Sequence, residues 1–436
     1  MQPIIDLSLA SMFRFVILFL TIMVFQGCAV IHKVDIKPQA FPIQSAESLA
    51  QNEFTISKDD DVVGRIAVIR IEKGDTLPDV ARHFSLGINE ISLANPGVDV
   101  WVPEAGTLVM LPFSFILPDA PRKGIIINLA TMRLFHFQPD KKSMVVSTYP
   151  VGIGTSERPT PMGKAYVMRK VIQPTWHVPA SIAEDHRKKG DPLPAEILPG
   201  PENPLGEYAL YLSKSSYLIH GTNKPASIGL KATNGCIRLY PEHIQNLYRK
   251  TPVNTSVYII NQPYLIGKLN GMAYIEIHAP VEAQNTSELK KLFAKLKDIE
   301  KKSAYKIDWK KVYKALDEVR GVAVPILDIP QRKEQAESIV EIRHPGKLYG
   351  SPEIPELRME AWYVLVTEFR DAVDAARMAA MINHQGPPIP ARVLSKRDSY
   401  RVIAGPFKDV GEAKDAMKRL KIDLGMDGIL IEPVRN

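Results

Sequence analysis

Basic runs and interleaved basic and aromatic residues are missing from this chain of 436 residues, although its formal net charge is +7. Sites for single-stranded nucleic acid combine a basic groove with stacking aromatic side chains, so we expect no nucleic acid as a partner. Metal-ligand spacings and phosphate-binding loops are missing as well, so we expect no metal ion and no cofactor. The mild positive charge remains compatible with an anionic polymer as a partner.

The apolar run near the N terminus is too short to span a bilayer, which requires roughly 20 apolar residues. Residues 15–25 follow Arg14 and match the hydrophobic region of an export signal. Gln26-Gly27-Cys28 comes next and resembles a bacterial lipobox, in which the cysteine is lipidated. We therefore expect residues 1–28 to be a signal peptide with a lipobox, and Cys28 to anchor the protein in the outer membrane, facing the periplasm of a Gram-negative bacterium. An ordinary signal peptide with an incidental cysteine is the alternative.

Cysteine is scarce, because the chain has only two. Paired cysteines become disulfides in the oxidising periplasm, and lipidation of Cys28 would leave Cys236 without a partner. An unpaired thiol there is more often functional than structural, although a small buried side chain is the other interpretation. Cys236 stands in Thr233-Asn234-Gly235-Cys236-Ile237-Arg238-Leu239, and His220 lies a short loop upstream. A thiol in a glycine-flanked turn with an upstream histidine is typical of a Cys/His nucleophilic enzyme.

The neighbours of Cys236 suggest a role for each residue in acyl transfer. His220 is expected to act as the base or ion-pair partner, because an adjacent imidazolium lowers the pKa of a thiol. The carbonyl of Gly221 is a candidate acceptor for the other ring nitrogen of His220. The N–H groups of Gly235 and Cys236 are expected to face the developing oxyanion. Arg238 projects to the same side if the segment is extended, where it would hold a substrate carboxylate.

Composition and periodicity divide the rest of the chain into modules. Residues 29–63 are polar and irregular, which predicts a tether. Residues 64–113 have a strand, two short helices and a closing strand, and with Gly74-Asp75-Thr76-Leu77 and Ala94-Asn95-Pro96 they resemble a LysM module, a binder of N-acetylglucosamine-containing glycans. A generic small α+β domain is the alternative. Residues 120–280 predict a mostly-β catalytic domain, a sandwich or open barrel.

The C-terminal part contains helical segments followed by a weak repeat. Residues 281–358 predict a linker with charged helices and a proline-bearing extended stretch. Residues 359–436 show a strand followed by an alanine-rich helix twice over, with Gly405-Pro406-Phe407 in the second copy. This segment resembles a SPOR domain, which binds peptidoglycan strands lacking stem peptides; an unrelated ferredoxin-like domain is the alternative. The predicted fold class is therefore multidomain, with a mostly-β catalytic domain between two small α+β domains.

The catalytic stretch resembles the L,D-transpeptidase catalytic domain, also called the YkuD domain. The resemblance rests on His220-Gly221-Thr222, Ile228-Gly229 and Thr233 to Leu239, and it extends upstream to Pro150-Val151-Gly152-Ile153-Gly154. Many family members carry a histidine where this chain has Asn234, and a serine is commoner than Thr233. We expect Thr233 and Asn234 to contact substrate or orient the loop.

The resemblance implies a two-step reaction on peptidoglycan. Cys236 would attack the diaminopimelate carbonyl of a tetrapeptide stem and release D-alanine. The acyl group would then pass to an amine, either in another stem, giving a 3→3 crosslink, or in a lysine of an envelope lipoprotein. Water as the acceptor would make the protein an L,D-carboxypeptidase. A non-catalytic peptidoglycan-binding scaffold is the rival of another class.

Overall fold

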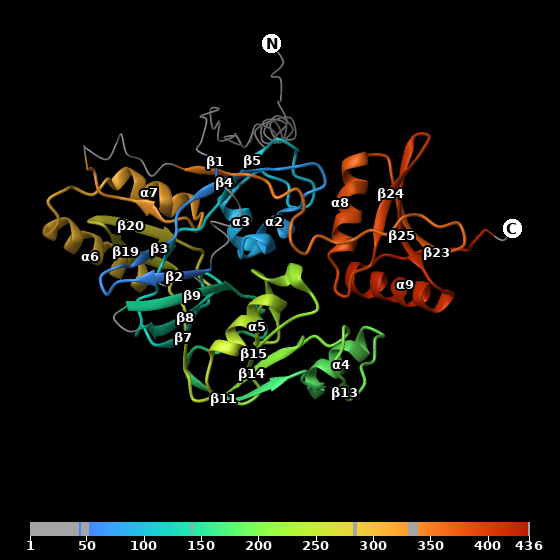
Figure 1. Ribbon diagram of the computed structural model, residues 1–436, viewed down its shortest axis with the longest axis horizontal. Coiled ribbons are helices and arrows are strands. Elements are labelled where there is room, and N and C mark those ends of the chain that lie inside the picture. Colours follow the sequence, from blue (N-terminus) through green and yellow to red (C-terminus); the bar gives the residue numbers. More distant parts are fainter. Residues whose placement is uncertain (1–42, 45–51, 141–142, 282–285, 330–338, 435–436) are drawn as a thin grey trace, which may run out of the picture. The chain divides into compact units, whose positions relative to one another are not determined.

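The computed structural model describes residues 43–44, 52–140, 143–281, 286–329 and 339–434. The expected signal peptide, the lipobox with Cys28 and most of the expected tether lie outside these residues. None of the described helices is long and apolar enough to cross a membrane. Figure 1 shows the described elements coloured along the sequence.

A sheet of nine strands carries the catalytic region, in the order β17-β15-β14-β11-β18-β7-β8-β9-β2. The long strand β11 pairs through its first half with β18 and through its second half with β14, with a register shift between Val167 and Arg169, and this division lets the sheet curl. Neighbours are antiparallel except for β18 with β7 and β15 with β17. The predicted mostly-β catalytic domain is confirmed as a curled half-barrel. Its strands are β2 (Glu53–Ile56), β7 (Gly124–Asn128), β8 (Arg133–Asp140), β9 (Ser143–Pro150), β11 (Gly163–Ile172), β14 (Tyr208–Leu212), β15 (Leu218–His220), β17 (Ile237–Arg238) and β18 (Ser256–Ile260).

Helix α5 (Pro241–Lys250) follows the catalytic stretch and packs on this sheet. Its buried residues Ile244 and Leu247 join a core with Ile219, Ile237 and Leu239. The strands that carry the predicted catalytic residues are therefore held by buried apolar side chains on both sides of the motif.

The N-terminal module has the predicted order of strand, two helices and strand. Strand β4 (Ala67–Arg70) pairs antiparallel with β5 (Leu108–Leu111), and α2 (Leu77–His83) and α3 (Ile88–Ala94) lie between them in the chain. Thr76 caps α2 by accepting a hydrogen bond from the N–H of Asp79. Two strands from outside the module extend its sheet, β22 (Val340–Ile342) on β4 and β1 (Ile43–Gln44) on β22.

Residues 264–281 and 286–329 form a further folded layer, although most of them were expected to be a linker. Strands β19 (Tyr264–Leu269), β20 (Met272–Ile277) and β21 (Val324–Pro325) make a three-stranded sheet. Helices α6 (Thr286–Lys302) and α7 (Trp309–Glu318) pack on it, and Leu292, Leu296 and Val312 share its core. The short pair β3 (Val62–Val63) and β6 (Phe115–Ile116) adds Val62 and Ile116 to the same core. The charged faces of the helices are solvated as expected, but their apolar stripes meet a sheet.

The C-terminal domain has the repeat that its sequence predicts. Its sheet order is β24-β25-β23-β26, and all neighbours are antiparallel. Side chains of α8 and α9 share one core with one face of this sheet, including Ala375, Ala416 and Leu420. Its elements are β23 (Trp362–Phe369), α8 (Ala372–Asn383), β24 (Ala391–Lys396), β25 (Ser399–Phe407), α9 (Val410–Leu424) and β26 (Ile429–Ile431) (Figure 1).

Candidate active site

Two adjacent parallel strands bring the predicted catalytic residues together. His220 ends β15, Cys236 immediately precedes β17, and His220 is the register partner of Arg238. Partners on neighbouring strands point to the same face, so the imidazole and the guanidinium lie side by side. Cys236 lies two residues before Arg238 and so projects to the same side, where the charge of Arg238 acts on the pKa of both Cys236 and His220.

The turn before Cys236 is built around Thr233 and Gly235. The Thr233 hydroxyl accepts a hydrogen bond from the N–H of Gly235 (3.1 Å) and donates to the carbonyl of Cys236 (2.7 Å). Gly235 has φ +101°, and a Cβ there would lie 2.7 Å from Cε1 of Tyr217. Both the backbone conformation and the close contact therefore favour glycine at this position. The expected oxyanion role of the Gly235 N–H does not fit this arrangement, because the threonine hydroxyl already occupies that donor.

Burial keeps His220 neutral. Its Nδ1 donates to the carbonyl of Gly221 (2.7 Å), as the sequence predicts, which leaves Nε2 as the basic nitrogen. Desolvation, followed by the nearby charge of Arg238, lowers the pKa of His220 to about 3. The imidazole is therefore a neutral base at pH 7 and not the imidazolium that one form of the prediction assumed.

The thiol of Cys236 is protonated in the same state. Desolvation raises its pKa, while a backbone hydrogen bond from Leu218 and the charge of Arg238 oppose this effect. The Sγ atom donates a hydrogen bond to the carbonyl of Ser216 at 3.7 Å. A neutral thiol and a neutral imidazole in one site are suited to proton transfer at the moment of attack.

Arg238 has donors available for an anion. Its Nη1 donates to Oγ of Ser227 (3.0 Å), and its enclosed Nε has no hydrogen-bond partner. Within the described part of the chain, no carboxylate forms an ion pair with it. Burial lowers its pKa to about 10, so it keeps its charge at pH 7. An uncompensated guanidinium beside a nucleophile is suited to bind a carboxylate of a substrate.

Asn234 contacts a neighbouring loop, which fits the expectation that it orients the catalytic turn. Its Oδ1 accepts a hydrogen bond from Nη1 of Arg158 at 2.6 Å. Arg158, Thr160 and Ser216 reach the site from loops, and Ser227 reaches it from the 3-10 helix η2 (Pro225–Ser227). Sequence reasoning gave none of them a role. The one signal available was the stretch Pro159-Thr160-Pro161, which falls within the region of family resemblance.

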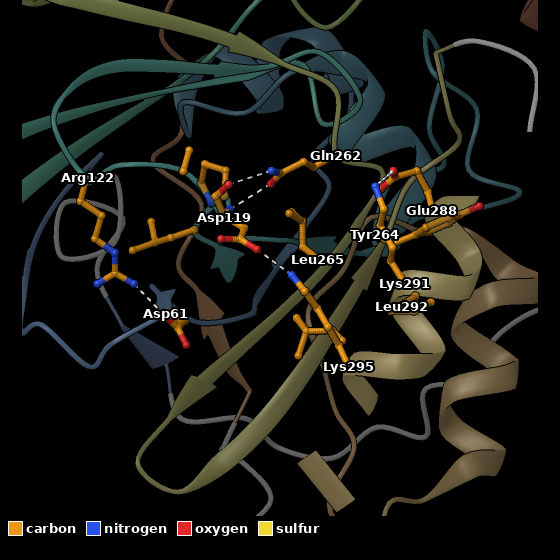
Figure 2. A pocket seen from close by; sticks show the side chains of 14 residues that line it. Asp61, Asp119, Arg122, Gln262, Tyr264, Leu265, Glu288, Lys291, Leu292 and Lys295 are labelled. Carbon is orange, nitrogen blue, oxygen red and sulfur yellow. Dashed lines mark hydrogen bonds and ion pairs between the residues drawn. The ribbon is translucent and has the colours of Figure 1, made fainter. Parts of the chain in front are cut away.

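A cavity of about 400 Å³ lies elsewhere, where residues 117–122 and strand β19 face α6 (Figure 2). Neither Cys236 nor His220 lines it. Three ion pairs balance its charges, Arg122 with Asp61, Lys295 with Asp119 and Lys291 with Glu288. The described residues also contain no group of three or more His, Cys, Asp or Glu side chains that could hold a metal. This cavity is therefore separate from the Cys236 turn.

A thiol, a neutral imidazole oriented by a carbonyl, and a guanidinium without a carboxylate partner among the described residues lie on one curled sheet, an arrangement suited to acyl transfer through a thioester. The model of the L,D-transpeptidase catalytic domain (YkuD) matches residues 122–259, and that of the SPOR domain matches residues 359–432. The probable L,D-transpeptidase YbiS of Escherichia coli K12 is 40% identical over 224 residues, covering 50% of this chain and 72% of YbiS. The chain belongs to the L,D-transpeptidase family.

Two further relatives have the same enzyme name. The probable L,D-transpeptidase ErfK/SrfK of Escherichia coli K12 is 38% identical over 231 residues, covering 52% of this chain and 73% of that protein. The solved catalytic domain of the E. faecium L,D-transpeptidase is 20% identical with a TM-score of 0.25, covering 33% of this chain and all of that domain. The predicted family, enzyme class and C-terminal SPOR domain are confirmed. The LysM assignment of residues 64–113 and the domain boundaries stay predictions.

Proposed function

We propose that Cys236 forms a thioester with the diaminopimelate residue of a peptidoglycan tetrapeptide stem. The thiol proton passes to Nε2 of His220 as Sγ bonds to the carbonyl carbon. The C–N bond to the terminal D-alanine then breaks, and His220 returns the proton to the leaving amine. Arg238 binds a carboxylate of the stem, and the N–H of Cys236 donates to the oxyanion.

The second half of the reaction transfers the acyl group to an amine. The amine attacks the thioester carbon, loses a proton through His220, and displaces the thiol, which is thereby regenerated. A diaminopimelate of another stem would give a 3→3 crosslink, and a lysine of an envelope lipoprotein would give protein attachment. Arg238 serves either outcome, because it contacts the acyl donor.

The observation that carries this proposal is the register of β15 and β17, which sets the oriented base His220 and the cation Arg238 side by side next to Cys236. Membership of the L,D-transpeptidase family supports the same reaction class. The SPOR domain supports peptidoglycan as the partner. The LysM-like module would add a second glycan contact, and Cys28 would place the protein on the periplasmic side of the outer membrane.

Intact-protein mass spectrometry with purified tetrapeptide-stem muropeptides tests the proposal. The wild type should gain the mass of the acyl stem and release D-alanine, and 3→3 dimers should accumulate in solution. Cys236→Ala should show neither adduct nor turnover, because it lacks the nucleophile. Circular dichroism of the variant is the control for folding.

Other results of the same experiment would distinguish the L,D-carboxypeptidase and the scaffold from the transpeptidase. An adduct followed only by free tripeptide would indicate an L,D-carboxypeptidase, or a reaction that awaits a protein acceptor. Adding a lysine-bearing envelope lipoprotein distinguishes these two cases. A folded wild type that forms no adduct and turns over no stem would contradict the enzymatic proposal and favour a peptidoglycan-binding scaffold.

A further inference from the structure

A loop without a role in the proposed reaction lies directly against the catalytic turn. Residues 155–160 follow strand β10 (Ile153–Gly154), which pairs with β16 (Lys231–Thr233) just before the nucleophile. The N–H of Thr155 donates to the carbonyl of Thr233 (3.0 Å), and the hydroxyl of Thr160 donates to the carbonyl of Gly235 (2.9 Å). The loop is thus attached to the turn near both of its ends, which fixes the position of Arg158 between them.

Arg158 connects the turn to a separate helix. Its Nη1 donates to Oδ1 of Asn234 at 2.6 Å, and its Nη2 pairs with the carboxylate of Asp185. Asp185 belongs to α4 (Ala180–Lys188). The rigid fork of a guanidinium can satisfy two acceptors in different directions, and here it links α4 to the residue two positions before Cys236.

The segment that contains α4 has few other attachments to the sheet. Residues 173–207 leave the sheet between β11 and β14, and they hold α4 and the two-residue strands β12 (Trp176–His177) and β13 (Glu196–Ile197). No residue of α4 is buried, and the buried side chains of the segment lie near its ends, at Pro174, Asn203 and Leu205. Segments with so little buried surface open at low free energy, so polar links have a large share in holding this one closed. Such links include the ion pairs of Arg158 with Asp185 and of Lys418 in α9 with Asp191 (2.9 Å), and the first of them is the one that leads to the catalytic turn.

The link also accounts for Asn234, where many family members carry histidine. A guanidinium only donates hydrogen bonds, so its partner must accept. The amide oxygen of Asn234 accepts at every pH, whereas a protonated imidazole would only donate and would repel Arg158. Asp185 supplies the balancing negative charge on the other side.

We propose that Arg158 is a positioning residue, which holds residues 173–207 as a lid beside the Cys236 turn and thereby sets the affinity for the stem peptide. The identity of that substrate rests on the proposed function. The attachment of the lid does not, because it can be measured without turnover.

Hydrogen exchange of the free protein tests the attachment. Arg158→Ala should accelerate amide exchange in residues 180–188, while exchange in β15 and α5 stays unchanged. Arg187→Ala is the matched control, because Arg187 lies on the same helix, is 68% exposed and pairs only with the neighbouring Glu184 among the described residues. Equal exchange in the two variants would overturn the proposal.

Kinetics on tetrapeptide stems provide the second measurement. Arg158→Ala should raise KM up to about fivefold, as expected for loss of a partly exposed ion pair and hydrogen bond, with kcat changed less than about twofold. Asn234→Ala should raise KM as well, and the double variant should be no worse than Arg158→Ala alone. Additive effects, or a fall in kcat with KM unchanged, would count against a lid. If exchange responds but the wild type turns over no stem, the proposed function fails and the attachment stands.

Discussion

At the scale of single residues, protonation of the reacting pair is set by what surrounds it. Burial lowers the pKa of His220 and raises that of Cys236, so the two groups are neutral together at pH 7. A thiolate–imidazolium pair would need both shifts to have the opposite sign. The charge of Arg238 favours the thiolate, and the same charge disfavours the imidazolium.

This arrangement predicts the pH dependence of thiol alkylation. The rate of modification of Cys236 by iodoacetamide should rise steadily with pH and show no plateau below about pH 9, because the pKa of the thiol is raised above its ordinary value. Arg238→Gln should move the profile to still higher pH, since it removes a charge that stabilises the thiolate. Arg249→Gln, an exposed change at the end of α5, should leave the profile in place. A plateau near neutral pH in the wild type would instead indicate a preformed ion pair.

The sequence predicts a site residue when nearby residues in the chain fix its position, and it fails when distant segments do. Cys236, His220, Gly221 and Arg238 lie in one short stretch of chain, so residue types and spacing were enough to expect them together, while their catalytic roles stay predictions. The contacts of Ser216, Ser227 and Arg158 depend on how separate segments pack together. A local sequence pattern does not indicate such packing. The oxyanion role expected for Gly235 overlooked the hydroxyl of Thr233, two residues before it, which competes for the same N–H.

At the scale of elements, periodicity predicted strands and helices better than it predicted their partners. The order strand-helix-helix-strand of residues 64–113 and the C-terminal repeat both agree with the structure. The helices of the expected linker were also predicted, but their sheet was not. The reason is that β20, whose six residues are all buried, belongs to a segment assigned to the catalytic domain. An amphipathic stripe shows that a helix needs an apolar partner without showing which one.

One contact between elements joins α3 to the loop that precedes the nucleophile. The N–H of Ile88 donates to the carbonyl of Ile228 (3.1 Å), and Gly229 has φ +88°. A Cβ on Gly229 would lie 2.7 Å from the backbone nitrogen of Ile88, closer than any relaxed contact. The same loop carries Ser227, the partner of Arg238. The N-terminal module therefore supports the loop that orients the proposed carboxylate binder.

Gly229→Ala should displace this loop and weaken substrate binding, which would be measured as a higher KM on tetrapeptide stems and a lower melting temperature. Gly106→Ala is a closely matched control, because Gly106 has φ +89° and no atom within 4 Å of an added Cβ. Both variants incur the cost of a left-handed alanine, roughly 1–2 kcal/mol, so any additional effect at Gly229 reports the clash. Equal losses in stability and unchanged KM would show that the loop accommodates the methyl group.

At the scale of the whole molecule, the N-terminal module and the catalytic sheet share one hydrophobic core. Ile69, Leu77 and Phe84 of the module pack in one cluster with Phe135 and Val146 of the sheet. The C-terminal SPOR domain has a core of its own. A glycan-binding module continuous with the catalytic sheet would hold a bound glycan at a fixed distance from Cys236, whereas a tethered module would leave that distance variable.

The shared core predicts that the module and the sheet unfold together, and one buried ion pair tests it. Arg133 of β8 donates to both carboxylate oxygens of Glu90 in α3 at 2.6 Å, and these side chains are 2% and 6% exposed. Arg133→Met leaves the carboxylate buried and unpaired, so it should cost about 3–5 kcal/mol in urea unfolding. In a background that keeps Trp101 of the module and replaces the other three tryptophans by phenylalanine, fluorescence and circular dichroism should move to the same lower midpoint. Arg70→Met, which removes a pair whose arginine is 52% exposed, should cost at most about 1 kcal/mol. Separate midpoints for the two signals would mean that the module is an independent unit, and the fixed distance between glycan and thiol would then lose its physical basis.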